Sequence, residues 1–318
     1  MHTIVIGGTG HVGTYLVPRL VEAGHKVTVV SRGKRDPYTP HGAWRAVNHV
    51  IMDRTGDETR GTFGTQIRDL EPDIVIDMIC FTLDSAQHLV HALRGHVQGF
   101  LHCSTCWVHG KTVSVPVTED QPRQPIGDYG IKKVAIEAYL HHEAHQAGFP
   151  ETCILPGHIV GPGWVPLNPQ ANFNPDVYTA LAKGEPLVLP NLGQELVHHV
   201  HADDVAQLFM LAIENWNAAV GQSFHAVSPA ALTLRGYAEA AAGWFGQAAD
   251  LSFQPFPAWR EGVSERDAEA TWSHLEHSPN CYSIAKPQRL LGYQPRYTSL
   301  QAIREAVTWL VDRDIVKV

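Results

Sequence analysis

The feature that most constrains the fold is a glycine-rich motif near the start of the chain. It reads Gly7-Gly8-Thr9-Gly10-His11-Val12-Gly13 and lies between a β-branched run at 3–6 and a helical pattern at 12–23. A strand that turns into a helix through closely spaced glycines is the context that a dinucleotide-binding loop needs. In such a loop Gly7 permits the tight turn, Gly10 lets the backbone approach a pyrophosphate, and Gly13 lets the helix pack closely on the sheet.

Strand and helix patterns alternate along the first half of the chain. Strands are predicted at 3–6, 27–30, 47–52, 74–79 and 100–104, and helices at 12–23, 63–70, 84–93 and 129–147. This alternation predicts an α/β fold with a doubly wound parallel sheet covered by helices on both faces. Pro18 lies inside the first helix, where it removes a hydrogen bond, and the sequence offers no reason for it.

Beyond about residue 153 the pattern loosens and prolines cluster, at positions 156, 162, 166, 169 and 175. Because proline disfavours helix interiors, we expect this segment to leave the sheet and build a loop-rich, substrate-binding region. Trp164 and Phe173 lie here, and lining of a substrate pocket and packing within a lid fit them equally well.

The residues after the second strand bear on the choice of dinucleotide. An NAD-binding chain would place a carboxylate about 20 residues after the glycines to bond the ribose hydroxyls, but here the strand ends Val-Val-Ser-Arg-Gly-Lys-Arg at 29–35. The hydroxyl of Ser31 and the guanidinium of Arg32 suit a 2′-phosphate, so we expect NADP rather than NAD. The alternative is that this basic run is a solvated loop. Asp53, after the third strand, is placed to meet the adenine or to cap a loop.

Tyr129 and Lys133 form a Tyr-x-x-x-Lys pair at the start of the long helix predicted after the fifth strand. Residues four apart share one face of a helix. An ammonium stabilises a nearby phenolate, so we expect Lys133 to lower the pKa of Tyr129 and make it a general acid/base. Lys133 is also expected to hold the nicotinamide ribose.

Hydroxyl side chains stand at the end of the fifth predicted strand, in Cys103-Ser104-Thr105-Cys106. Ligands of open parallel sheets bind at the carboxyl ends of the strands. Thr105 or Ser104 is therefore expected to hold the substrate oxygen beside Tyr129.

Together these motifs resemble the extended short-chain dehydrogenase/reductase family, the NAD(P)-dependent epimerase/dehydratase group. Three later segments are similar to the family's as well. They are Leu-Pro-Gly-His-Ile-Val-Gly-Pro-Gly at 155–163, His-Val-His-Ala-Asp-Asp-Val-Ala at 199–206, and Ser-Ile-Ala-Lys at 283–286 with Leu-Leu-Gly-Tyr-Gln-Pro at 290–295. The resemblance thus covers essentially the whole chain.

The resemblance implies a Rossmann domain at 1–165, to which 196–228 returns, and a substrate-binding region at 166–195 and 229–318. It places the family's catalytic hydroxyl on Thr105, with Tyr129 and Lys133 in the other catalytic positions. The residues expected at the cofactor are Gly7, Thr9, Gly10, His11, Val12, Gly13, Ser31, Arg32, Asp53, Ser104, Lys133, Pro156 and His158.

Departures from the family pattern bear on the substrate. Cys106 and Trp107 follow Thr105 where family dehydratases carry an acidic pair, which argues against 4,6-dehydration. The stretch 195–198 holds no arginine of the kind that binds the diphosphate of nucleotide sugars, although Arg235 or Arg260 could replace it. His158 is expected to contact the nicotinamide or the substrate.

Several cysteine, histidine and aspartate patterns resemble metal-binding or catalytic motifs, but structural roles fit them better. No metal site is expected. Cys103 and Cys106 lack a second pair at zinc spacing. The histidines at 141, 142 and 145 fail the zinc-protease spacing and are expected on the exposed face of their helix. The histidines at 198, 199 and 201 alternate along a strand and are expected to make packing and polar contacts. Asp203 is expected to cap the helix that follows it.

Two classes of function remain open from the sequence. The first is an epimerase or ketoreductase that moves hydride at a carbinol carbon of a sugar-like small molecule, with Tyr129 transferring the proton. The second is a non-catalytic nucleotide-sensing or RNA-associated protein on the same fold, a class that includes a chloroplast group of family relatives. The intact Thr105, Tyr129 and Lys133 favour the enzyme.

The composition bears on the cellular compartment of the protein and on the kinds of partner that it binds. The net charge of −8 over 318 residues gives no sign of nucleic-acid binding, and no apolar stretch reaches the about 20 residues that span a membrane. Five cysteines in a long chain, with no signal peptide before the first strand, predict a reduced protein of the cytoplasm. From the family we expect a homodimer paired through the helices at 84–93 and 129–147.

Overall fold

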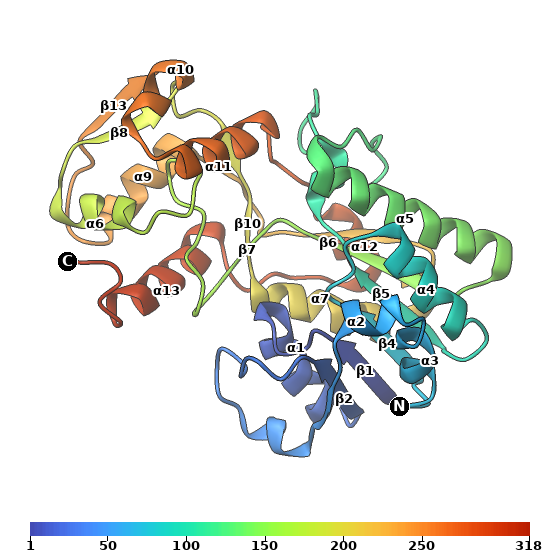
Figure 1. The fold of residues 1–318 in the computed structure, drawn as a ribbon. Helices are drawn as coiled ribbons and strands as arrows, with labels where there is room; N and C mark the ends of the chain where they lie inside the picture. The colour runs from blue at the N-terminus through green and yellow to red at the C-terminus, as the bar shows by residue number, and fades with distance from the viewer.

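A seven-stranded parallel sheet forms the centre of the molecule, seen in the computed structural model of residues 1–318 (Figure 1). Its strand order is β11-β6-β5-β4-β1-β2-β3, and every neighbouring pair is parallel. The strands are β1 (His2–Ile6), β2 (Lys26–Ser31), β3 (Asn48–Ile51), β4 (Ile74–Asp77), β5 (Gly99–Cys103), β6 (Glu151–Pro156) and β11 (Ser223–Ala226). The order reverses between β1 and β4, which confirms the predicted doubly wound Rossmann sheet.

Helices cover both faces of this sheet. On one face α1 (His11–Glu22) packs against α7 (Ala202–Glu214), and α7 contacts α8 (Trp216–Ala219) and α12 (Ala285–Leu291). The other face carries α3 (Phe63–Arg68), α4 (Leu83–Leu93) and α5 (Gly127–Ala147), with α2 (Arg54–Thr59) beside α3. Burial on both faces explains why the strand sequences are nearly continuous apolar runs.

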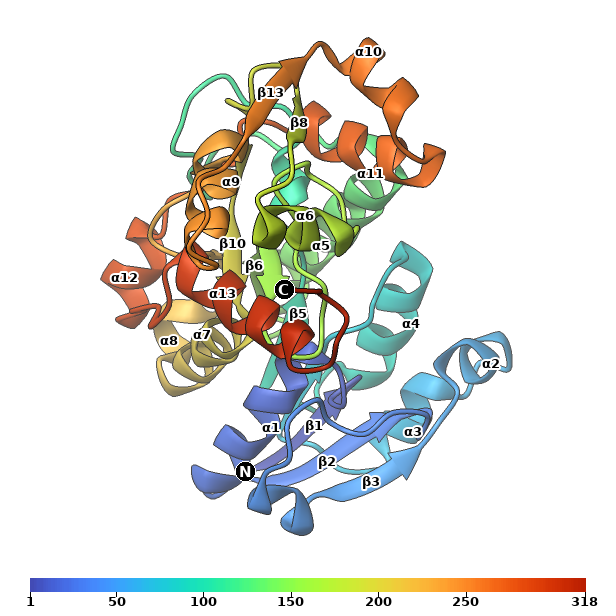
Figure 2. The ribbon, with the colours of Figure 1, turned by 90° about the vertical axis from the view of Figure 1, so that its left-hand side faces the viewer.

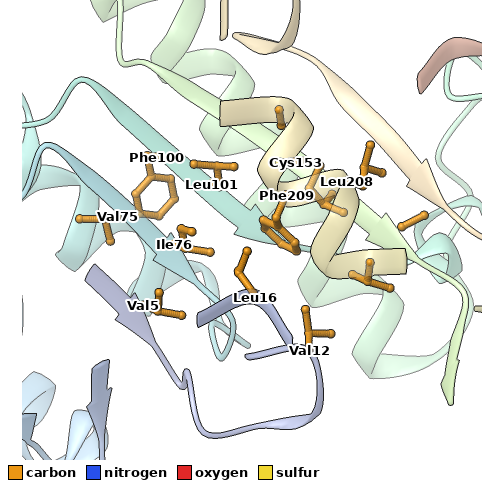
Figure 3. Close-up of a cluster of buried hydrophobic side chains, with 14 of the residues drawn as sticks. Val5, Val12, Leu16, Val75, Ile76, Phe100, Leu101, Cys153, Leu208 and Phe209 are labelled. Atoms are coloured by element: carbon orange, nitrogen blue, oxygen red, sulfur yellow. The ribbon is translucent and has the colours of Figure 1, made fainter. Parts of the chain in front are cut away.

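Side chains from the sheet, α1 and α7 interlock in the core layer of Figure 3. Val5, Ile76 and Leu101 of the strands share one face of the sheet and lie with Phe209 of α7 there, and each is fully buried. This layer holds the amino end of α1 against the sheet, and with it the glycine motif. Pro18 is buried within α1, which continues through it.

A second hydrophobic core lies outside the sheet, in the upper part of Figure 2. Three two-stranded sheets surround it: β7 with β10, β9 with β12, and β8 with β13. Their bounds are β7 (His158–Val160), β8 (Leu187–Pro190), β9 (Leu196–Val197), β10 (His199–His201), β12 (Leu232–Thr233) and β13 (Leu251–Gln254). The helices of this part are α6 (Asp176–Lys183), α9 (Leu234–Gly243), α10 (Phe256–Trp259), α11 (Glu265–Glu276) and α13 (Ser299–Val311).

Three short 3₁₀ helices complete the fold: η1 (Gly42–Ala46), η2 (Cys106–His109) and η3 (Arg260–Gly262). No helix of the structure combines the length and the apolar character needed to cross a membrane.

The start of α7 corrects one expectation. His201, not Asp203, is the N-cap residue, and its Nδ1 accepts a hydrogen bond of 3.0 Å from the backbone N–H of Asp203. The Asp203 carboxylate is held instead by two arginines, Arg19 of α1 and Arg296. Charge pairing across α1 and the C-terminal segment outweighs capping here.

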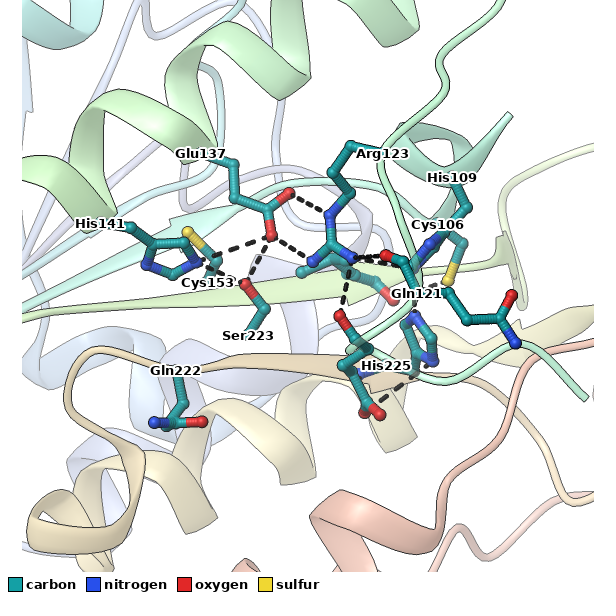
Figure 4. Close-up of polar contacts among 12 residues, drawn as sticks. Cys106, His109, Gln121, Arg123, Glu137, His141, Cys153, Gln222, Ser223 and His225 are labelled. Atoms are coloured by element: carbon teal, nitrogen blue, oxygen red, sulfur yellow. Dashed lines mark hydrogen bonds and ion pairs between the residues drawn. The ribbon is translucent and has the colours of Figure 1, made fainter. Parts of the chain in front are cut away.

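A buried charged network fixes α5 on the sheet (Figure 4). Arg123 donates to the Glu137 carboxylate over 2.6 Å, and the Ser223 hydroxyl donates to the same carboxylate over 2.6 Å. His141 donates to Glu151 over 2.8 Å and to Ser223 over 2.9 Å. The expectation that His141 lies on an exposed face is therefore wrong, whereas His142 and His145 are exposed.

The charge of His141 depends on this network. Burial alone would lower the pKa of its imidazole, but the hydrogen bonds and charges of Glu137 and Glu151 outweigh burial and raise it to about 9. A histidine whose pKa is raised on folding stabilises the fold fully below its unfolded value of 6.5. That contribution is lost as the pH rises through about 9.

We therefore expect His141→Gln to cost stability mainly at low pH. The free-energy gap between wild type and variant should shrink by about 2–3 kcal/mol between pH 6.5 and pH 9.5. Urea unfolding at the two pH values measures it, with the exposed His142→Gln as the matched control. A gap that stays constant would show that His141 does not titrate in this range.

Candidate active site

The glycine motif forms the tight strand-to-helix turn that its sequence predicts. Gly7 has φ +81°, a conformation that side chains other than glycine rarely adopt. A Cβ on Gly13 would lie 2.0 Å from the carbonyl oxygen of Gly8, so α1 approaches the turn more closely than any side chain allows. The amino end of α1 is thereby held at the carboxyl edge of β1.

A cleft of about 400 Å³ opens beside this turn. It brings together six of the residues predicted for the cofactor, from β1, β2 and the segment after β3: Gly7, Thr9, Gly10, Ser31, Arg32 and Asp53. Lys34 and Arg35 join Arg32 in its lining, so the end of the cleft near β2 is positively charged. Asp53 precedes α2 but makes no capping hydrogen bond through its side chain, which leaves its carboxylate available in the cleft.

Two cleft features escaped the sequence analysis. Arg54 lines the cleft and donates from Nη1 to the fully buried Asp77 over 2.7 Å and from Nε to Glu58 over 2.7 Å. Its charge is therefore neutralised within the protein, unlike that of Arg32. Phe81 lines the same cleft and is 51% exposed. Glu58 lies four residues after Arg54 in α2, but nothing in the sequence marks the contact of Arg54 with Asp77 or of Phe81 with Lys133, because these partners come from separate strands and helices.

The remaining predicted cofactor residues lie around this cleft without lining it. Val12 and Gly13 are buried in the first turn of α1, and Pro156 is buried at the end of β6. Ser104 follows β5, and its buried hydroxyl has no hydrogen-bond partner in the protein. An unpaired hydroxyl beside an open cleft fits a dinucleotide, whose ribose could supply the missing partner.

His11 is enclosed by aromatic rings. Its imidazole lies 4.4 Å from the ring of Trp164 and 5.3 Å from that of Tyr38, and Trp164 donates to the Tyr38 hydroxyl over 2.8 Å. Burial, with the nearby His201, lowers the pKa of His11 to about 3, so the ring is neutral. Trp164 thus packs over His11 of the glycine motif.

The three predicted catalytic residues come together at the carboxyl edge of β5. Lys133 is buried and donates to the backbone carbonyls of Cys80 and Cys103, each over 2.8 Å. Its Nζ lies 5.0 Å from the ring centre of Phe81 and 5.9 Å from that of Tyr129. The Thr105 hydroxyl is near enough to Tyr129 to act on the pKa of its phenol.

The acidity of Tyr129 differs from the expectation. Burial raises the pKa of its phenol to about 12, the neighbouring Cys103 thiol adds to this, and the nearby Thr105 hydroxyl opposes it. Lys133, whose ammonium donates to two backbone carbonyls, does not offset this rise. In this state Tyr129 carries its proton at neutral pH and is a proton donor.

Next to Tyr129 lies a group of rings that we call the aromatic–imidazole cluster, formed by Trp107, His158, Phe173, His274 and His277. Trp107 of η2 lies 6.3 Å from the Tyr129 ring and stacks on His277 at 4.0 Å. His158 therefore lies on the Tyr129 side, 6.1 Å from Trp107, and does not line the glycine-motif cleft. Phe173 contacts His274 at 5.7 Å, unlike Trp164. Trp107 was marked in the sequence only by its place after Thr105, and His274 and His277 had no sequence signal that tied them to the site.

The thiols and the remaining histidines have structural environments. Burial raises the pKa of Cys103 to about 11 and raises that of Cys106 well above its usual value, so both stay protonated. His198 and His199 bond the backbone carbonyls of Ser228 and Leu167, as polar packing groups do.

Comparison with known proteins places this geometry in a family context. The model of the NAD dependent epimerase/dehydratase family matches residues 3–226. The 2′-dehydrokanamycin reductase of Streptomyces kanamyceticus is 28% identical over 204 residues, which are 64% of this chain and 55% of that protein. The chain thus matches only about half the length of this reductase.

Two further similarities cover nearly the whole chain. The chloroplast stem-loop binding protein of 41 kDa b from Arabidopsis thaliana is 23% identical over 315 residues, which are 95% of this chain and 77% of that protein. The crystal structure of UDP-glucose 4-epimerase from Thermotoga maritima, solved with UDP-glucose, has a TM-score of 0.74 at 20% identity and covers 98% of this chain and 99% of that one. This structural likeness shows a shared fold.

Proposed function

We propose that this chain, which belongs to the NAD-dependent epimerase/dehydratase family, is an enzyme that transfers hydride at a carbinol or carbonyl carbon of a sugar-like molecule. One observation carries the proposal. Thr105, Tyr129 and Lys133 gather at one strand edge, and Phe81 connects them to the glycine-motif cleft, because its ring contacts Lys133 and lines that cleft. A proton donor thus stands beside a site suited to a dinucleotide.

Each residue has a separate role in this proposal. A bound nicotinamide cofactor supplies or accepts the hydride. Tyr129, protonated at neutral pH, donates its proton to the carbonyl oxygen during reduction and takes it back during oxidation. Thr105 bonds the same substrate oxygen and orients it. Lys133 holds the loop after β4 and the end of β5 in register. It would also hold the ribose of a bound nicotinamide cofactor.

Epimerisation and net reduction use the same three residues. If the keto intermediate turns over within the site and is reduced on its other face, an epimer results; if it leaves, the enzyme is a dehydrogenase or ketoreductase. The names of the relatives include both a reductase and an epimerase. We propose that the protein catalyses one of these two reactions, epimerisation or net reduction. The proposal rests on family membership and on the site residues.

We further propose NADP as the preferred cofactor. The charged end of the cleft supports it, because Arg32, Lys34 and Arg35 lie where β2 ends, and no acidic side chain from that loop joins them. Thr9, Gly10 and the amino end of α1 would hold the pyrophosphate, and Ser31 and Arg32 the 2′-phosphate.

The division of labour along the chain is also a proposal. Residues 1–165 with 196–228 would hold the cofactor, and 166–195 with 229–318 would bind the substrate. The existence of two hydrophobic cores supports it. Tyr282, Ile284, Leu291 and Tyr293 pack into the core of the sheet, so part of the C-terminal segment braces the cofactor side.

We propose a homodimer of the cytoplasm, paired through α4 and α5. Both helices lie side by side on one face of the sheet (Figure 1) and present polar side chains such as His91 and His142 to solvent. Light scattering on the purified protein is expected to give twice the monomer mass of 35.0 kDa. A monomer mass at micromolar concentration would exclude the pairing.

A non-catalytic role is the second candidate, favoured by the similarity to the chloroplast stem-loop binding protein. An RNA-associated protein, however, does not need a buried Lys133 beside a protonated Tyr129. Turnover that depends on Tyr129 separates the two classes.

Tyr129→Phe is expected to lower kcat at least about 100-fold, because it removes the proton donor and leaves the cleft intact. Reduction of 2′-dehydrokanamycin and epimerisation of UDP-glucose, taken from the names of the relatives, are the first assays. Tyr139→Phe, on the same helix, is the matched control and should retain activity. Turnover that survives in Tyr129→Phe would contradict the role of Tyr129.

Arg32→Ala is expected to weaken NADPH binding about 10- to 100-fold, because it removes a charge-assisted hydrogen bond to phosphate. NADH, which lacks that phosphate, should change less than about twofold. Titration followed by nicotinamide fluorescence measures both, with Arg45→Ala outside the cleft as the control. Equal losses for the two cofactors, or tighter binding of NADH by the wild type, would overturn the NADP preference.

A further inference from the structure

The aromatic–imidazole cluster is built from segments far apart in the chain. Trp107 comes from η2, His158 from β7 and His274 from α11, and His274 lies 5.2 Å from Trp107 and 4.9 Å from His158. Phe173 and Tyr129 at its margin remain 44% and 43% exposed. The margin of the cluster therefore presents ring surface to solvent beside the proposed proton donor.

Two imidazoles of the cluster, those of His158 and His274, are uncharged at neutral pH. Burial lowers the pKa of His274 to about 4, and burial with the neighbouring histidines lowers that of His158 well below 6.5. No lysine or arginine is among its five side chains. A diphosphate group needs cationic or guanidinium partners when it leaves water, so this surface offers it none.

The two arginines that could have served a diphosphate are engaged elsewhere. Arg235 of α9 donates to Glu239 over 2.8 Å and lies 5.8 Å from the ring centre of Phe253. Arg260 lies over the ring of Phe256, at 5.9 Å. Neither belongs to the cluster.

His277 adds a specific hydrogen-bonding group. Its Nδ1 lies 2.7 Å from the carbonyl oxygen of Ser273, and because a carbonyl only accepts, Nδ1 carries the hydrogen. In the neutral ring Nε2 is then an acceptor, and this atom is buried without a partner. A hydroxyl group can donate to it, whereas an ionised phosphate cannot.

We propose that the aromatic–imidazole cluster is the substrate subsite, and that it selects a phosphate-free hydroxylated ring, such as a glycoside, over a nucleotide diphosphate sugar. The inference rests on the proposed function, since it takes the reacting carbon to lie at Tyr129. Ring C–H groups of the substrate pack on Trp107, and a substrate hydroxyl donates to His277. Trp107 and His277 are then specificity-determining residues for the reaction.

The test compares one sugar with and without phosphate. Saturation-transfer NMR titrations of the NADPH-loaded protein use methyl α-D-glucoside, glucose 1-phosphate and UDP-glucose, and the same series is repeated with galactose. We expect both methyl glycosides to bind at least as tightly as their phosphorylated counterparts. Trp107→Ala should weaken them about tenfold, and His277→Phe, which keeps the stacked ring, about fivefold.

Trp272→Ala is the matched control, because this exposed residue of α11 packs on Phe256 away from Tyr129, and it should leave glycoside binding unchanged. Phosphorylated sugars that bind ten times more tightly than the methyl glycosides, or methyl glycosides that fail to bind at 100 mM (~100-fold above a millimolar Kd), would overturn the inference. If NADPH binds in those samples, the proposed function stands even then. If neither NADPH nor NADH binds, the proposed function itself fails.

Discussion

The site depends on the burial of one ammonium group without a carboxylate partner. Lys133 is held by two backbone carbonyls, at Cys80 after β4 and at Cys103 at the end of β5. Taking a charge out of water is costly, so these carbonyls must stay in place and α5 cannot slide along the sheet. Lys133, Glu137 and His141 recur every four residues and share the face of α5 that meets the sheet. The placement of the proposed catalytic Lys133 and the buried ion network therefore depend on the same face of the same helix.

This arrangement explains what could be predicted from sequence and what could not. The turn at Gly7, the close approach at Gly13 and the parallel sheet follow from local backbone freedom and from apolar runs, which a sequence displays directly. The position of His141 does not, because its partners come from β6 and β11. Glu137, on its own helix, is bonded to a serine 86 residues away. A row of polar residues on a helix is therefore predicted to be solvent-exposed when the residues that pair with it lie far away in the sequence.

The candidate site also has properties that cannot be predicted from the sequence. The positions of Thr105, Tyr129 and Lys133 were open to prediction because motif and strand end coincide. The acidity of Tyr129 was not, since it depends on burial and on where the Lys133 ammonium points, and both are tertiary properties. Likewise Trp107 came into view only as a departure from a family pattern. Its meaning rests on His274 and His277, which are brought to it by α11. The two ends of the proposed binding region thus differ in charge: the end near Arg32 is cationic, and the end near Trp107 has no lysine or arginine among the side chains of the aromatic–imidazole cluster.

The sulfur atoms have a consequence for the chemistry that this protein can survive. All five cysteines are free, and burial raises the pKa of every thiol, including Cys103 and Cys106 on either side of the Ser104–Thr105 pair. Alkylating reagents and peroxides attack the thiolate rather than the thiol. The thiols that flank Ser104 and Thr105 are therefore poor nucleophiles, and the sulfur at the candidate site reacts slowly with such electrophiles.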